Sequence, residues 1–182
     1  AFGTLVERHG RTIVHFVQRF LGDIGRETAE DLAQEVLIKA WQASSTFTPQ
    51  AKVLTWLLRI TTNTCLNHRR RQRLRRALSL TSESATEVVD RAASHERRAE
   101  TVEQGKRVRK AVTRLPANQR AAIVLRHYHG FSYAQIAEVL EVSVPSIESL
   151  LFRARRRLQK TLAVAVDEKS PQVSSELGAE PL

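Results

Sequence analysis

The chain has 182 residues, a formal net charge of +10 and a single cysteine, Cys65. The length allows one medium domain or two small ones, and the lone cysteine excludes an internal disulfide, which favours a reducing cytosol. No apolar run approaches the roughly 20 residues of a membrane-spanning helix, and the positive charge favours a polyanionic partner, either nucleic acid or an acidic membrane surface.

Strand-like alternation is hard to find and glycine and proline are sparse, so we expect an all-α fold. Two strongly patterned helical blocks flank a weaker middle rich in serine, threonine and acidic residues. We therefore expect two helical domains joined by a flexible linker and followed by a frayed polar tail. The expected bounds are 1–76 for the first domain, 77–110 for the linker, 111–164 for the second domain and 165–182 for the tail.

The first patterned helix follows "TAED", Thr28 to Asp31, a capping-box pattern with Asp in place of the usual Glu. Its apolar residues recur at helical spacing and predict one buried stripe: Leu32, Ala33, Val36, Leu37, Ala40 and Trp41. The opposite face carries Asp31, Gln34, Glu35, Ile38 and Lys39. An exposed Ile38 beside carboxylates suits docking onto a basic partner helix, but an ordinary charged face remains an alternative.

Phe47, Thr48 and Pro49 break that helix, and a second long helix is expected from Val53 to Arg76. It ends in "NHRRRQRLRR", whose six arginines repel one another unless anions lie nearby. Three side chains fall roughly on one line of this helix: Trp56, Asn63 and Asn67. An aromatic ring beside amides and a basic run suits unpaired bases. The alternative places Trp56 in the core and both asparagines in solvent.

The C-terminal block is predicted to hold a helix-turn-helix. Pro116 opens a helix and Gly130 follows its end. "SYAQ", Ser132 to Gln135, is a capping box that begins a short helix, and a turn at 141–143 leads into the last helix. Five residues of that helix are predicted to pack inward: Ile147, Leu150, Leu151, Ala154 and Leu158. Ser146, Ser149, Phe152, Arg153 and Arg156 fall on the outward side.

The outward side of this last helix suits DNA. Short polar groups near the helix start can reach base edges in a major groove, and arginines further along can hold phosphates. Glu148 could accept a hydrogen bond from a cytosine amino group or pair with a neighbouring arginine. The alternative is a solvated basic face on a packed three-helix bundle.

Three segments together resemble the extracytoplasmic-function (ECF) sigma factors of bacteria, which belong to the sigma-70 family. "AEDLAQEVLIKAW" (Ala29 to Trp41) resembles the segment that binds core polymerase. "STFTPQAKVLTWLLRITTNTCLNHRRR" (Ser45 to Arg71) resembles the segment that melts the promoter and reads its downstream element. Leu115 to Leu158 resembles the domain that binds the upstream element.

The resemblance implies roles for individual residues. Core polymerase would be bound by Asp31, Gln34, Glu35, Ile38 and Lys39. The downstream (minus-10) element would be bound by Phe47, Trp56, Asn63, Asn67, Arg69, Arg70 and Arg71. In that set Phe47 and Asn63 would form a pocket for a flipped base, Trp56 would support it and the arginines would hold the backbone. The upstream (minus-35) element would be bound by Ser146, Glu148, Ser149, Phe152, Arg153 and Arg156.

The resemblance also implies the partners: promoter DNA, core RNA polymerase and an anti-sigma factor, often membrane-anchored. We expect a cytoplasmic protein, tethered at the inner membrane where that factor is anchored there. An enzyme is disfavoured, because the sequence has no Gly-rich phosphate loop, paired carboxylates in an apolar setting or Cys/His cluster, and we expect no metal, cofactor or small-molecule substrate. Cys65 is expected to be a small buried residue. Two other classes stay open: a helix-turn-helix regulator that acts without polymerase docking, and an RNA-binding adaptor.

Overall fold

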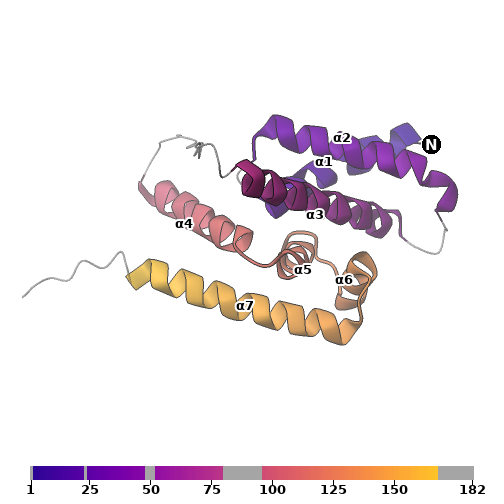
Figure 1. Cartoon of the computed structure of the whole chain (residues 1–182). Coiled ribbons are helices and arrows are strands. Elements are labelled where there is room, and N and C mark those ends of the chain that lie inside the picture. Colours follow the sequence, from indigo (N-terminus) through magenta and orange to yellow (C-terminus); the bar gives the residue numbers. More distant parts are fainter. Residues whose placement is uncertain (1, 23, 48–51, 80–95, 168–182) are drawn as a thin grey trace, which may run out of the picture.

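The computed structural model describes residues 2–22, 24–47, 52–79 and 96–167, and within these ranges every regular element is helical (Figure 1). The all-α prediction is therefore confirmed. The elements in chain order are α1 (Phe2–Leu21), α2 (Arg26–Gln42), the short 3-10 helix η1 (Ser44–Thr46), α3 (Val53–Ser79), α4 (Glu96–Thr113), α5 (Ala117–Tyr128), α6 (Tyr133–Leu140) and α7 (Val144–Asp167). None of the described helices is long and apolar enough to cross a membrane.

The start and the end of α2 differ from the sequence prediction. The helix begins at Arg26 after Gly25 with no side-chain cap, so the predicted capping box at Thr28 is wrong. The backbone N–H of Ala29 already bonds the Gly25 carbonyl at 3.1 Å, which places Thr28 inside the helix. At the other end Trp41 is 60% exposed rather than buried. Its ring lies edge-on to that of Phe2, 5.0 Å between centroids, at the rim of the block.

The second predicted helix is confirmed as α3, which runs three residues further than expected, to Ser79. Leu57, Leu58 and Thr61 are buried on its inner face, with Leu54 half-buried beside them. The buried hydroxyls of Thr61 and Thr62 donate to the Leu57 and Leu58 carbonyls at 2.7 Å, so neither is left without a partner. Of the predicted helix breakers, Thr48 and Pro49 lie outside the described residues.

Part of the expected linker is helical. Residues 80–95 lie outside the described structure, but α3 fills 77–79 and α4 fills 96–113. Ala111 and Val112 are buried and Val108 is half-buried, a spacing of three and four residues that anchors α4 on one side. At the other end of the second block, α7 continues to Asp167, and the rest of the expected tail lies outside the described residues.

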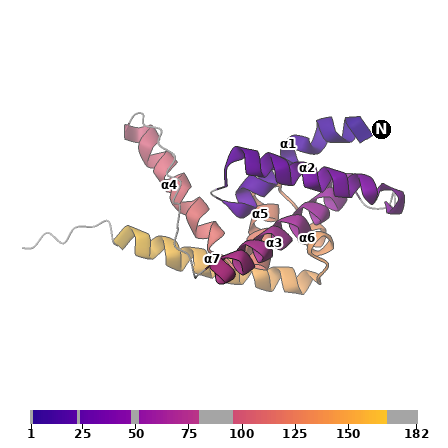
Figure 2. The same ribbon diagram turned by 45° about the horizontal axis from the view of Figure 1, so that its top comes forward.

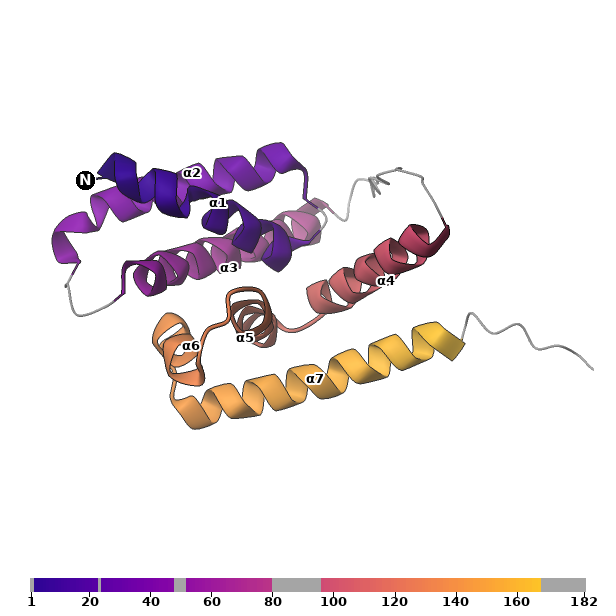
Figure 3. The same ribbon diagram turned by 180° about the vertical axis from the view of Figure 1, so that it is seen from behind.

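The two helical blocks pack against each other. Helices α1, α2 and α3 contact one another in the first block, and α5, α6 and α7 do so in the second, with α4 beside α7. Figures 1 and 3 show α5 and α6 between α3 and α7. Helix α1 contacts α5 and α3 contacts α6, and these two contacts form the seam between the blocks. The first turns of α4 project away from the α1–α3 block (Figure 2).

Helix α1 supplies the apolar face that joins both blocks. Ile13, Phe16, Val17 and Phe20 are fully buried at helical spacing. The Phe16 ring lies 5.8 Å from the ring of Phe20 and 5.5 Å from that of His129, which follows α5. Residues of the two blocks therefore form one continuous hydrophobic core.

Candidate nucleic-acid interface

Local hydrogen bonds fix both the start of α6 and the turn between α6 and α7. The Ser132 hydroxyl accepts from the Gln135 backbone N–H at 3.2 Å, and the Gln135 side-chain oxygen accepts from the Ser132 N–H at 2.9 Å, so the predicted capping box is confirmed. Glu141 ends α6 in the left-handed conformation, with φ of 55°. The hydroxyls of Ser143 and Ser146 lie 2.9 Å apart at the start of α7. The left-handed Glu141 and the Ser143–Ser146 hydrogen bond therefore fix the turn that leads into α7.

Helix α7 has the two faces that its periodicity predicts. Ile147, Leu151 and Ala154 are buried, with Leu150 and Leu158 half-buried beside them. The predicted outward residues are all exposed: Ser146, Glu148, Ser149, Phe152, Arg153 and Arg156.

The most unusual member of this outward face is Phe152, which is 61% exposed. The guanidinium of Arg156 lies 5.9 Å from its ring centroid, and Arg153 Nε donates to the Ser149 carbonyl at 3.2 Å. No ion pair between described residues involves Glu148. An aromatic ring that is left in water among arginines contributes nothing to the core, which favours a binding role.

The outer face of α2 combines acidic and apolar groups. Asp31 and Gln34 are exposed, and Ile38 is 58% exposed. Glu35 and Lys39 form an ion pair of 2.6 Å, and Lys39 Nζ also donates to the Thr64 hydroxyl of α3 at 3.2 Å. Lys39 therefore braces α2 on α3, whereas Asp31, Gln34 and Ile38 are open to a partner.

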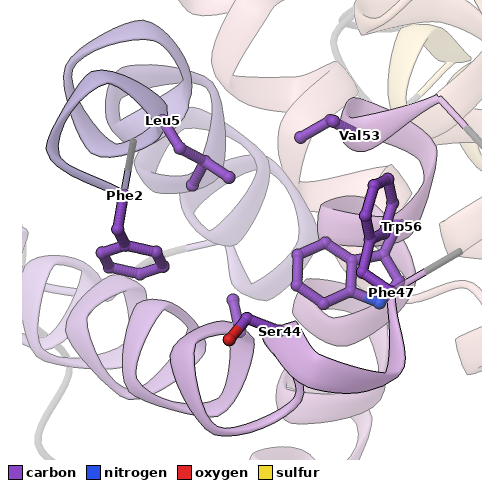
Figure 4. Close-up of a pocket in the computed structure, with 7 residues that line it drawn as sticks. Phe2, Leu5, Ser44, Phe47, Val53 and Trp56 are labelled. Atoms are coloured by element: carbon purple, nitrogen blue, oxygen red, sulfur yellow. The ribbon is translucent and has the colours of Figure 1, made fainter. Parts of the chain in front are cut away.

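An apolar cavity lies where α1, the end of α2, η1 and the start of α3 meet (Figure 4). The rings of Phe47 and Trp56 form one side, with 5.1 Å between their centroids and 57° between their planes. Phe2 and Leu5 of α1 face them across the cavity, whose volume is about 160 Å³. The sequence prediction missed these two, although their place in the apolar pattern of α1 was available as a signal.

Asn63 is not one of the residues lining this cavity. It is exposed on α3, seven residues beyond Trp56 and therefore about 10 Å further along the helix axis. The structure brings Phe47 and Trp56 together, as expected of a pocket, and separates Asn63 from them. Asn67 is exposed one turn beyond Asn63.

The arginine run of α3 divides between two surfaces. Arg70 and Arg71 are exposed, whereas Arg69 is half-buried and its Nη1 has no hydrogen-bond partner among the described residues. Burial, together with the nearby Arg73, lowers the pKa of Arg69. The three arginines expected to act together therefore do not share one face.

Arg120, which the sequence prediction overlooked, is the largest fully buried side chain, with 1% exposed. Its Nη1 donates to the Phe20 carbonyl of α1 at 2.8 Å and its Nη2 to the Leu115 carbonyl at 3.2 Å. Burial, with Arg69 and Arg73 close by, lowers the pKa of Arg120 to about 9. Its spacing of three and four from the buried Ile123 and Val124 was the available signal.

Cys65 is buried as predicted, and burial, with Glu35 adding to the effect, raises its pKa to about 12. The thiol is therefore protonated at neutral pH and is no nucleophile. Within the described ranges no three His, Cys, Asp or Glu side chains are grouped so that they could hold a metal ion.

Two family models match the chain: sigma-70 region 2 over residues 5–75 and sigma-70 region 4 over residues 105–158. The RNA polymerase sigma-H factor of Pseudomonas aeruginosa is 34% identical over 168 residues, which cover 89% of this chain and 86% of the relative. The ECF RNA polymerase sigma factor SigM of Mycobacterium tuberculosis is 35% identical over 162 residues, 89% of this chain and 77% of the relative. Among solved structures, the sigma factor RpoE in complex with the anti-sigma factor NepR from Bartonella quintana matches with a TM-score of 0.69 and 28% identity, over 90% of this chain and 97% of that chain.

Proposed function

Since the chain belongs to the extracytoplasmic-function group of the sigma-70 family of RNA polymerase sigma factors, we propose that it directs core RNA polymerase to promoters through surfaces on both helical blocks. The first block docks on polymerase and holds unpaired bases of the minus-10 element. The second block reads the minus-35 element as duplex DNA. The chain acts by binding alone and performs no chemical step itself.

The outward face of α7 is the observation that carries this proposal. Its serines lie in the first turns of the helix, where a recognition helix contacts base edges, and Arg153 and Arg156 lie further along. The exposed ring of Phe152 offers apolar contact to a thymine methyl group. Because Ile147, Leu151 and Ala154 anchor the opposite face, this surface is presented on a rigid element.

The first block offers two further surfaces that fit the proposal. Ile38, beside Asp31 and Gln34, provides an apolar anchor with an acidic neighbour for a basic helix of polymerase. The Phe47–Trp56 cavity offers aromatic surface to an unstacked base. Stacking of this kind contributes about 1–3 kcal/mol per base, which offsets part of an unstacking cost of a few kcal/mol.

We also infer that an anti-sigma factor holds the chain inactive. The similar RpoE structure is a complex with an anti-sigma factor, which supports such a partner for this chain. The chain would then act in the bacterial cytoplasm, and a membrane-anchored partner would tether it at the inner membrane. A pull-down from the native organism with this chain as bait would identify the partner.

A helix-turn-helix regulator that acts without polymerase is the alternative function. The exposed Ile38 surface of α2 favours the sigma factor, because DNA binding by α7 gives no reason for an apolar residue there. Tight promoter-specific binding by the purified chain without core polymerase would favour the regulator.

The α7 surface is tested by the double variant Phe152→Ala/Arg153→Ala. We expect promoter-specific transcription with purified core polymerase to fall at least about tenfold, because each base contact contributes about 1–3 kcal/mol. Core binding should stay at the wild-type level. Arg155→Ala is the matched control, since Arg155 is exposed on the flank of α7 beside His127. A loss of core binding by the double variant would refute the assignment of this face to DNA.

The α2 surface is tested by Asp31→Lys/Glu35→Lys. Like charges across an interface cost several kcal/mol, so affinity for core polymerase, measured by fluorescence anisotropy, should fall at least about tenfold. The control is Glu7→Lys, the same charge reversal at an exposed position of α1. Wild-type affinity of the double variant would exclude α2 as the docking surface.

A further inference from the structure

A small polar cavity lies at the seam between the two blocks, on the side of α3 that faces α5. Its volume is about 200 Å³, space for roughly six or seven waters at about 30 Å³ each. Six polar side chains line it: Arg69, Gln72, Arg73 and Arg76 of α3, Thr113 of α4 and Arg120 of α5. Four guanidinium groups from both blocks therefore line one partly open space, in which Arg120 is buried, Arg69 is half-buried, and Arg73 and Arg76 are exposed.

The positive charge of this cavity has no counter-charge within the described residues. None of the ion pairs there involves Arg69, Arg73, Arg76 or Arg120. Arg120 is 1% exposed, and its two hydrogen bonds go to neutral carbonyls while its Nε has no partner. The buried Nη1 of Arg69 likewise has no partner among the described residues. Burying a cation without an anion costs desolvation free energy, so this cluster is unfavourable unless an anion binds to it.

The arginines that line the cavity lie on a different side of α3 from Arg71 and Arg75. Arg69, Arg73 and Arg76 follow a spacing of four and three and line the cavity. Arg71 and Arg75 instead lie close enough to His68 to lower its pKa, although burial of the imidazole has the larger effect.

We propose that this cavity binds a small phosphate-bearing anion, which joins α3 to α5 by accepting hydrogen bonds from the guanidinium groups of both blocks. The planar guanidinium matches phosphate oxygens in a two-bond geometry, and a diphosphate carries more charge than a carboxylate, as four cations require. The recessed position of Arg120 favours a free anion over duplex DNA, whose phosphates lie on a convex surface. The ligand class is orthophosphate, diphosphate or the diphosphate group of a nucleotide.

Such a ligand would stabilise the packed arrangement of the blocks, with a free energy that grows as the logarithm of its concentration above the dissociation constant. The bound anion would also lower the desolvation cost of the buried guanidinium groups, because its oxygens accept hydrogen bonds that water would otherwise accept. This inference is independent of the residue roles proposed for α2 and α7, because none of those outer faces lines the cavity.

The test is isothermal titration of the full chain with pyrophosphate at constant ionic strength, so that general charge screening stays fixed. We expect one site per chain. Arg73→Gln/Arg76→Gln should weaken binding at least about tenfold, since hydrogen bonds between charged groups are the strong ones. Arg71→Gln/Arg75→Gln removes the same two charges from the other side of the same helix and should change the dissociation constant by less than about twofold.

Arg120→Lys adds a test of geometry, because it keeps the charge and loses the two-bond fork. With its helical circular dichroism intact, it should bind pyrophosphate several-fold more weakly. Titrations with orthophosphate and ADP separate the sources: equal affinity for ADP and pyrophosphate indicates a free diphosphate, and tighter ADP binding indicates a nucleotide.

Two results would overturn the proposal. Equal weakening in both double glutamine variants would show diffuse attraction to a chain of net charge +10. Unchanged pyrophosphate binding by Arg73→Gln/Arg76→Gln, together with weaker binding of a non-promoter duplex, would assign these arginines to the DNA backbone instead.

Discussion

Arg59 and Arg120 each reach from one helical block to the other, and they meet different surroundings. Arg59 of α3 donates to the Glu138 carbonyl at 2.8 and 3.2 Å, and its Nη1 lies 3.4 Å from the Glu141 carboxylate. The side chains of this ion pair are 39% and 65% exposed. Arg120 of α5 is buried, donates to the carbonyls of Phe20 and Leu115, and lies 5.6 Å from the centroid of the Phe20 ring.

The difference shows that the seam is not uniform. The α3–α6 end carries a solvent-screened ion pair beside its packed helices, and such a pair contributes little to stability. At the α1–α5 end a cation satisfies the Phe20 carbonyl, one of the last four of α1, which lack partners within the helix. The surrounding aromatic rings of α1 are fully buried. We therefore expect the buried contacts of Phe20 and Arg120 to contribute more to stability than the exposed contacts of Arg59.

The largest expected effect comes from Phe20→Ala at the buried end. Removing a fully buried ring should lower the free energy of unfolding by about 3–5 kcal/mol. Urea denaturation followed by the fluorescence of Trp41 and Trp56 measures it. Phe152→Ala is the matched control, because that ring is 61% exposed and its loss should stay within about 0.5 kcal/mol. Equal losses would show that the α1 face is not buried between the blocks in solution.

An intermediate effect is expected from Arg120→Met, which keeps the apolar stem and removes both donors. Relief of repulsion from Arg69 and Arg73 opposes the loss of the hydrogen bonds. Since an unsatisfied buried carbonyl costs about 1–3 kcal/mol, we expect a net loss of about 1–2 kcal/mol. Amide hydrogen exchange in the last turn of α1 should become about 5- to 30-fold faster. A more stable variant would mean that charge repulsion outweighs the capping of α1.

The smallest effect is expected from Arg59→Ala at the exposed end, about 1 kcal/mol or less. Because the ion pair is screened, the effect should shrink further in 1 M salt, where the Debye length is about 3 Å. Urea denaturation at low and high salt measures both values. Arg26→Ala removes an exposed partner of Glu30 away from the seam and serves as the control. If Arg59→Ala lowered the free energy of unfolding as much as Arg120→Met does, the proposed difference between the buried and the exposed contacts would be wrong.

Much of the second block could be predicted from the sequence because its signals are local. The Ser132–Gln135 box and the inner and outer faces of α7 depend on residues three and four apart. The same reasoning failed at Thr28 because α2 begins at Arg26, and its N-cap, Gly25, has no side chain that could signal the start. It failed at Trp41 because a residue at the end of a helix can lie on the apolar stripe and still extend past the edge of its neighbour.

The candidate site was predictable where one helix presents it and less so where several helices meet. The exposed set on α7 required only periodicity. The cavity beside Phe47 and Trp56 is completed by Phe2 and Leu5, which lie more than 40 residues before Phe47 in the chain. Predicting it would have required the position of α1. Nothing in local spacing indicates that α1 reaches that point.

The sequence by itself determined most of the helices, the cap of α6, the exposed basic face of α7 and the family, since all of these depend on neighbouring residues or on contiguous motifs. Only the tertiary structure decided that Arg69 turns away from Arg70 and Arg71, and that Arg120 lies buried against the end of α1. Phe20 and Arg120 are 100 residues apart, and a contact at that separation forms only when the packing of whole helices brings both ends into one core.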